Sequence, residues 1–96
     1  MPAETVPVVD LDQERLLRLL PPYHVIVHND DVHTFNDVAR ALHQVLGVSL
    51  KRGLEMAGIV HNHGQCIVAT RPKEVAELYR ERLEGYKLTV TIEPAE

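Results

Sequence analysis

Cysteine is almost absent from this sequence, and its scarcity is the first of several shortages that narrow the protein's class. Of the 96 residues only Cys66 is a cysteine, so no disulfide can form within the chain. A chain without disulfides is typical of a reducing compartment. The acidic opening segment Met1–Glu4 lacks the basic stretch that begins a secretory signal. We therefore expect a soluble, cytoplasmic protein.

Excess basic charge and long apolar runs are also missing. The formal net charge is −4 and the pI is about 5.8, whereas general nucleic-acid binders carry a basic patch. No apolar run approaches the roughly 20 residues that are needed to span a bilayer. Glycine-rich phosphate-binding loops are absent as well. We therefore expect neither nucleic-acid nor membrane partners.

The residues that are present suffice for one small domain. Apolar residues make up 45% of the chain, which is enough for one hydrophobic core but not for two. Residues 1–22 hold four of the six prolines. The amphipathic stretch Leu11–Leu20 within them is too short to form a stable helix alone. We therefore predict a flexible N-terminal arm over residues 1–22 and a folded domain over residues 23–96.

Apolar periodicity and helix-ending residues predict six elements in the domain. Thr34 and Ser49 are good N-caps, and glycines follow the expected helices. The expected elements are a strand over Tyr23–His28, a helix from Thr34 to Gly47, a helix from Ser49 to about Asn62, a strand over Gln65–Thr70, a helix from Pro72 to Gly85 and a strand over Tyr86–Glu93. This β-α-α-β-α-β order predicts an α+β fold, a small sandwich of three helices on a three-stranded, mainly antiparallel sheet.

One helical stripe brings a histidine into line with apolar residues. In the second expected helix, Leu50, Leu54, Ala57 and His61 recur at helical spacing and therefore share one face.

The cluster Asn29-Asp30-Asp31 is the chemically most informative segment. It follows the first expected strand and precedes the Thr34 helix start, so it lies in a strand-to-helix turn. Asn and Asp favour turns because their side chains bond the nearby backbone. A turn needs only one carboxylate, however, and two adjacent carboxylates repel each other. The cluster is therefore expected either to be a simple turn or to bind a cation, which would be a metal or an ammonium group.

Metal binding and catalysis have weaker support. A metal site would use Asp30, Asp31, His33 and His61, but the sequence has no His-Glu-x-x-His or paired Cys-x-x-Cys motif. Cys66 lies in an apolar strand, where cysteine usually acts as a small hydrophobe rather than a nucleophile. We therefore predict no catalytic residues, no cofactor and no enzymatic activity, and we keep metal binding as an alternative.

Several motifs taken together resemble the ClpS family, the adaptors of the ATP-dependent Clp protease. The segment Tyr23-His-Val-Ile-Val-His-Asn-Asp-Asp31 is followed at the expected distance by Val60-His61-x-x-Gly64, and later by Lys73-Glu-Val-Ala-Glu77 and Leu88-Thr-Val-Thr-Ile-Glu93. The resemblance implies an α+β domain that binds proteins whose first residue is Leu, Phe, Tyr or Trp. It also implies delivery of these substrates to a Clp AAA+ unfoldase.

The resemblance also implies the residues of the binding site. Asn29, Asp30 and His61 match the positions that contact the substrate's α-amino group. An ammonium group has three donors, and these side chains supply acceptors for them. The apolar pit for the first side chain matches Phe35, Val38, Ala57, Val60 and Leu88. His33 matches a position near the second substrate residue.

The chain departs from the family pattern at several positions. Phe35 and Ala57 stand where the family commonly has methionine, so the pit is reshaped. On the third helix, Glu74 matches a position that faces the unfoldase, but Tyr79 replaces the usual lysine. The resemblance therefore also leaves open a degenerate regulatory module that modulates the unfoldase without reading N-termini.

Overall fold

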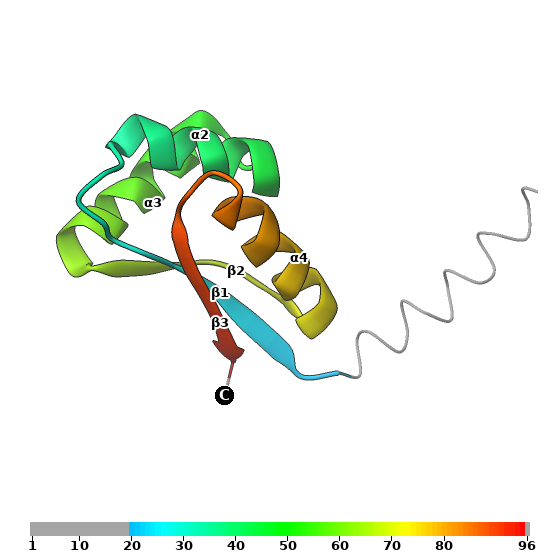
Figure 1. The fold of residues 1–96 in the computed structure, drawn as a ribbon. Coiled ribbons are helices and arrows are strands. Elements are labelled where there is room, and N and C mark those ends of the chain that lie inside the picture. The colour runs from blue at the N-terminus through cyan, green and yellow to red at the C-terminus, as the bar shows by residue number, and fades with distance from the viewer. Residues whose placement is uncertain (1–19, 96) are drawn as a thin grey trace, which may run out of the picture.

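Three antiparallel strands and three helices make up residues 20–95, the part of the chain that the computed structural model describes (Figure 1). The elements are β1 (Pro22–His28), α2 (Phe35–Leu46), α3 (Leu50–His63), β2 (Gln65–Pro72), α4 (Lys73–Glu84) and β3 (Thr89–Pro94). Their order confirms the predicted α+β fold and its β-α-α-β-α-β sequence. The predicted arm, up to residue 19, lies outside the described residues. Within residues 20–95, no helix is both long and apolar enough to cross a bilayer.

The sheet places β1 between the other two strands, in the order β2-β1-β3. Both neighbours run antiparallel to β1. A register shift between Val25 and Ile26 interrupts the pairing with β2, while the pairing with β3 is continuous. At the far end of β1, His28 pairs with Gln65, the first residue of β2. The end of β1 is therefore fixed beside the end of α3, which β2 follows directly.

Local sequence determines where α2 and α3 begin and end, as predicted. The Thr34 side chain accepts a hydrogen bond from the backbone N–H of Asp37, and the Asp37 side chain accepts one from the backbone N–H of Thr34. This reciprocal pair is a capping box, which satisfies two donors at the helix start. The Ser49 side chain caps α3 in the usual way. Gly47 and Gly64 then end the two helices in the left-handed conformation that glycine adopts without strain.

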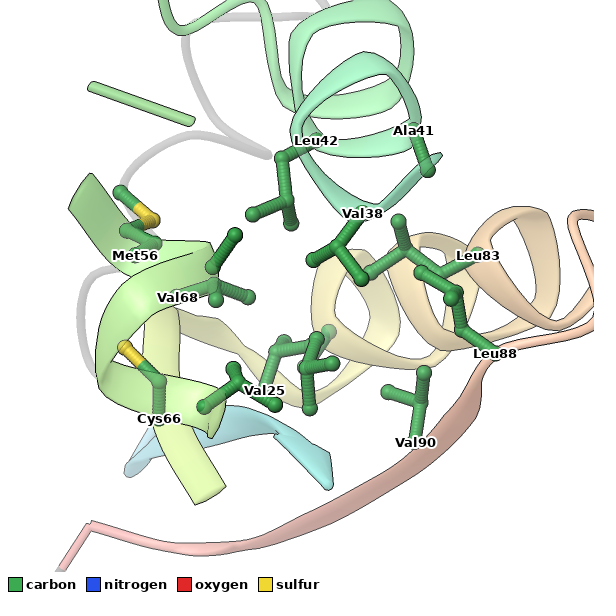
Figure 2. Packing of buried hydrophobic residues seen from close by; sticks show 14 residues of the cluster. Val25, Val38, Ala41, Leu42, Met56, Cys66, Val68, Leu83, Leu88 and Val90 are labelled. Atoms are coloured by element: carbon green, nitrogen blue, oxygen red, sulfur yellow. The ribbon is translucent and has the colours of Figure 1, made fainter. Parts of the chain in front are cut away.

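The hydrophobic core lies between the sheet and the three helices. Figure 2 shows side chains from α2, α3, α4 and all three strands meeting there, with Val25, Val90 and Cys66 on the sheet side and Leu42, Met56 and Leu83 on the helix side. α2 and α3 approach each other so closely that a Cβ added at Gly53 would lie 2.8 Å from the backbone oxygen of Ala39. A glycine at position 53 therefore permits this helix–helix contact.

The buried face of α3 differs from the predicted stripe. Gly53, Met56, Ala57 and Val60 are its buried residues, whereas Leu50 and Leu54 are about half exposed. Ala57 thus belongs to the core, but the rest of the Leu50–His61 stripe lies toward solvent. Helical spacing predicts which residues share a face, but it does not predict the direction in which that face points.

The final strand is shorter than predicted. The sequence predicted a strand over Tyr86–Glu93, but β3 begins only at Thr89, and residues 85–87 form a turn. The backbone N–H groups of Tyr86 and Lys87 donate to the carbonyls of Leu83 and Glu84, so the chain continues to curl after α4. Lys87 has a positive φ of 70°, which is incompatible with a strand. Tyr86 is consequently exposed and does not join the buried face of the sheet.

Candidate functional site

Asp30 occupies the turn between β1 and α2, and its own side chain holds that turn together. Asp30 Oδ1 accepts hydrogen bonds from the backbone N–H groups of Val32 at 2.9 Å and His33 at 2.8 Å. Asp30 Oδ2 lies 2.9 Å from Nδ1 of the His33 ring. The expectation of a side-chain-bonded turn is therefore confirmed for Asp30. The turn does not by itself exclude binding, because a carboxylate has about four acceptor positions and these contacts use three.

The surroundings of Asp30 favour its charged form. Burial alone would raise the pKa of the Asp30 carboxyl, but the hydrogen bonds donated by His33 and Val32 outweigh this and hold the pKa below its ordinary value. At neutral pH the turn therefore presents a fixed negative charge.

This charge gives Asp30 a pH-dependent role in stability. A carboxyl whose pKa is lowered by folding stabilises the fold above its unfolded pKa of about 3.9, and this contribution is lost as the pH falls through the folded pKa. Asp30→Asn keeps an oxygen acceptor but removes the charge. We expect this variant to be less stable than the wild type at pH 7, and the difference to shrink below about pH 4. Urea unfolding at pH 7, 5, 4 and 3 measures this, and a constant difference at all four values would contradict it.

Asp31 provides the matched control for that measurement. Its side chain is exposed and makes no hydrogen bond to any other residue of the 20–95 segment. The Asp31→Asn variant should therefore show no comparable pH-dependent difference from the wild type.

The end of α3 lies against the same turn. The backbone N–H of Asn29 donates to the carbonyl of Gly64 at 2.9 Å, and Gly64 caps the helix that carries His61 on its last turn. Asn29 and His61 are 32 positions apart in the sequence, and this hydrogen bond joins their two segments. The three residues predicted to contact an α-amino group therefore come from two segments that meet at one junction.

Phe35, the first residue of α2, contacts the histidine at this junction. Its ring meets the His61 ring edge to face, with the ring centroids 5.1 Å apart and the planes at 64°. Phe35 is 43% exposed, so it lies at the surface. The contact leaves the position of His61 dependent on Phe35, which is the first residue of α2.

The other predicted pit residues lie in the core beneath. Val38, Ala57, Val60 and Leu88 are all less than 9% exposed and belong to one cluster of buried side chains. Figure 2 shows Val38 and Leu88 extending into the same part of that cluster, next to Leu83. The structure thus groups these four residues in the core, whereas Phe35 lies at the surface against His61.

A surface pocket of about 330 Å³ lies beside the turn and is lined by His33, Asp37, Arg40 and Tyr86. Its members Arg40 and Tyr86 were missed by the sequence interpretation. Arg40 follows Asp37 by three residues on α2, and this spacing indicates that the two side chains are neighbours on the helix surface. Tyr86 had no such signal, because its alternating neighbours indicated a strand. His33 therefore lies between Asp30 and this pocket.

The side chains proposed for a metal site do not assemble into one. Among the described residues, no group of three or more His, Cys, Asp or Glu side chains is placed to hold a metal ion. His33 instead pairs with Asp30 alone. Burial raises the pKa of the Cys66 thiol, which keeps it in the less reactive neutral form. Neither metal binding nor a cysteine nucleophile therefore finds support in this geometry.

The two residues predicted to face an unfoldase differ in accessibility. Glu74 is exposed on the first turn of α4 and lines an open surface pocket with Glu77, Leu78, Arg80 and Glu81. Tyr79 is half-buried and packs against the core. Glu74 is thus available for contact, whereas Tyr79 contributes mainly to packing.

Comparisons with known proteins agree on one family. The family model described as "ATP-dependent Clp protease adaptor protein ClpS" matches residues 19–91. The ClpS adapter of Thermosynechococcus vestitus is 40% identical over 90 residues, which cover 91% of this chain and 96% of that protein. The Nostoc sp. ClpS adapter is 36% identical over 89 residues, covering 90% of this chain and 92% of the relative.

A solved structure has the same fold. The structure of Agrobacterium tumefaciens ClpS2 bound to L-phenylalaninamide superposes with a TM-score of 0.72 at 25% sequence identity. The match covers 77% of this chain and 96% of that one. Sequence, family model and fold therefore all show that this chain belongs to the ClpS family of adaptors of the ATP-dependent Clp protease.

Proposed function

We propose that this protein binds other proteins through a free N-terminal residue with a bulky apolar side chain and delivers them to a Clp AAA+ unfoldase. Leu, Phe, Tyr and Trp are the first residues that the site is expected to accept. The protein acts as a non-enzymatic adaptor in the cytoplasm and needs no cofactor.

The observation that carries the proposal is the charged Asp30 carboxylate in the turn between β1 and α2, two elements whose buried side chains belong to the apolar cluster. Its lowered pKa keeps it anionic, and one of its acceptor positions is not used by the turn. The backbone N–H of Asn29, the preceding residue, donates to the carbonyl of Gly64, which ends the helix that carries His61, and the side chains of Asn29 and His61 are the proposed further acceptors. A ligand with an ammonium group next to an apolar side chain would complement this arrangement, because the ammonium group would meet the carboxylate and the other acceptors while the side chain would meet the apolar residues.

The ligand of the solved neighbour fits the same description. L-phenylalaninamide, bound by Agrobacterium tumefaciens ClpS2, carries a free α-amino group, a benzyl side chain and an amide in place of the next peptide bond. It is therefore a minimal N-terminal phenylalanine. The fold that both chains share supports a site of the same kind here.

Peptide binding tests the proposal directly. Fluorescence anisotropy would compare labelled peptides that begin with Phe, Tyr, Trp, Leu, Ile or Ala, each with an N-acetylated control. We expect roughly micromolar affinity, about −8 kcal/mol, for the bulky residues. Acetylation should abolish binding because it removes the charge and two of the donors. Absence of binding to every free-amine peptide, or equal binding after acetylation, would overturn the proposal.

Peptide binding, compared with binding to the unfoldase, distinguishes the proposed adaptor from the regulatory alternative. Tyr79 packs against the core where the family commonly has lysine, so this chain presents a different surface to an unfoldase on α4. A protein that binds the unfoldase but none of the peptides would be a regulatory module. A protein that binds both would be the proposed adaptor.

A further inference from the structure

The ring of His33 is the nearest side chain to the proposed amine-binding carboxylate. Nδ1 of His33 lies 2.9 Å from Asp30 Oδ2, and the two side chains are only 16% and 21% exposed. The contact is therefore partly shielded from water, which strengthens a hydrogen bond relative to a fully exposed one.

The contacts of Asp30 are divided between its two oxygens. Two backbone N–H groups fill the acceptor positions of Oδ1, and the His33 ring fills one position of Oδ2. The backbone bonds hold Oδ1 in place, and the ring fixes the second oxygen, so the carboxylate plane cannot rotate freely. The one remaining acceptor position lies on Oδ2, beside the bond to the ring.

The contact also assigns the tautomer of His33. An anionic carboxylate can only accept, so Nδ1 must carry the hydrogen. In the neutral ring Nε2 then has no hydrogen. The ring contacts Asp30 and lines a surface pocket together with Asp37, Arg40 and Tyr86.

We propose that His33 is a positioning residue for amine recognition, whose Nδ1–H holds the Asp30 carboxylate so that the free position on Oδ2 faces the ammonium group of the substrate. This inference rests on the proposed function, because it concerns the same site. It assigns His33 a role beyond proximity to the second substrate residue. A carboxylate held in place before binding loses less rotational freedom when the ligand arrives, and this raises affinity.

Three substitutions separate this role from simple packing. The side-chain nitrogen of asparagine is as many bonds from Cβ as Nδ1 of histidine, so His33→Asn can still donate to Asp30. Glutamine places its nitrogen one bond farther, at the distance of Nε2, and His33→Gln therefore loses the donor at the required position. His33→Ala removes the donor altogether.

Anisotropy with a Phe-starting peptide and its acetylated control measures the effect. We expect His33→Ala and His33→Gln to weaken binding about fivefold or more, as for the loss of one hydrogen bond, and His33→Asn to stay within about twofold of the wild type. In the same proteins, an NMR titration of the Asp30 carboxyl should show a higher pKa in His33→Ala and His33→Gln than in the wild type and His33→Asn. Circular dichroism would confirm that each variant is folded.

The possible failures are distinguishable. Wild-type affinity in a folded His33→Ala protein, or equal losses in His33→Asn and His33→Gln, would overturn the positioning role and leave the proposed function intact. A wild type that binds no free-amine peptide would overturn both.

Discussion

Replacing Asp30 by alanine is expected to weaken binding of a Phe-starting peptide about 30- to 150-fold. Asp30 is the proposed charged acceptor of the site, and its loss would leave the ammonium group without an ionic partner. Hydrogen bonds to charged groups contribute about 2–3 kcal/mol each, which corresponds to this range. The variant also loses the acceptor for the backbone N–H groups of Val32 and His33, so the turn itself is less well held.

Asp31→Ala is the matched control for this prediction. Both residues carry a carboxylate in the same turn, but Asp31 is exposed and contacts no other described residue by a hydrogen bond. We expect a change of less than about twofold for Asp31→Ala, as is typical of an exposed charge at a distance. Anisotropy titrations of the two variants would show whether position or total charge matters. Equal losses in both would indicate that the turn attracts the amine only by its net negative charge.

The second large effect is expected on stability, at Gly53. Alanine is ordinarily favoured over glycine inside a helix by about 1 kcal/mol. At Gly53, however, the added Cβ would lie 2.8 Å from the backbone oxygen of Ala39 and 3.2 Å from its Cα. Backbone atoms cannot rotate away, so α3 would have to shift from α2. We expect Gly53→Ala to destabilise the fold by a net of about 1–3 kcal/mol, which is typical of overpacking.

Gly58→Ala in the same helix should act in the opposite direction. A Cβ at Gly58 meets no atom within 4 Å, so only the helix preference remains. We expect a gain of about 0.5–1 kcal/mol. Urea unfolding of the two variants measures the difference between them. Stabilisation by both substitutions would show that the contact between α2 and α3 relaxes without cost.

Displacement of α3 should also alter the proposed binding site. The helix carries Ala57 and Val60 in the core and His61 at its end. The Gly53→Ala variant is therefore expected to lose peptide affinity together with stability, whereas Gly58→Ala should affect stability alone.

The features that the sequence predicted best depend on short-range chemistry. Thr34, Ser49 and the glycines at 47 and 64 begin and end helices through contacts with residues at most four positions away. Such contacts can be recognised without knowing the fold. The turn at Asp30 belongs to the same class, because its acceptor role depends on residues two and three positions later.

The features that the sequence did not predict depend on tertiary contacts or on backbone conformation. The stripe from Leu50 to His61 has the correct periodicity, but packing against α2 selects the neighbouring face of α3. Tyr86 and Lys87 continue the alternating pattern of β3, yet the positive φ of Lys87 keeps them in the turn. The close approach of Gly53 to Ala39 has no sequence signal, since glycine also occurs in α3 at position 58 without any such contact.

The pit and the amine contacts were predicted through the family resemblance rather than through the pattern of residues. Periodicity alone predicted the helix that contains Val38. It could not bring Leu88, which precedes β3, to the same cluster as Val38 and Val60. Their shared role in binding a side chain remains a proposal that the peptide titrations test.

The central position of β1 has a mechanical consequence. The strand, which Figure 1 shows between β2 and β3, begins at Pro22, where the preceding chain enters the domain, and ends at His28, directly before Asn29 and Asp30 of the proposed site. Tension applied to the chain before Pro22 would act along β1, and both neighbouring strands are antiparallel to it. The hydrogen bonds that join β1 to β2 and to β3 would then be loaded in shear, so they would share the force instead of opening one after another. The pulling force and the proposed substrate would act at opposite ends of β1, which lie roughly 20 Å apart.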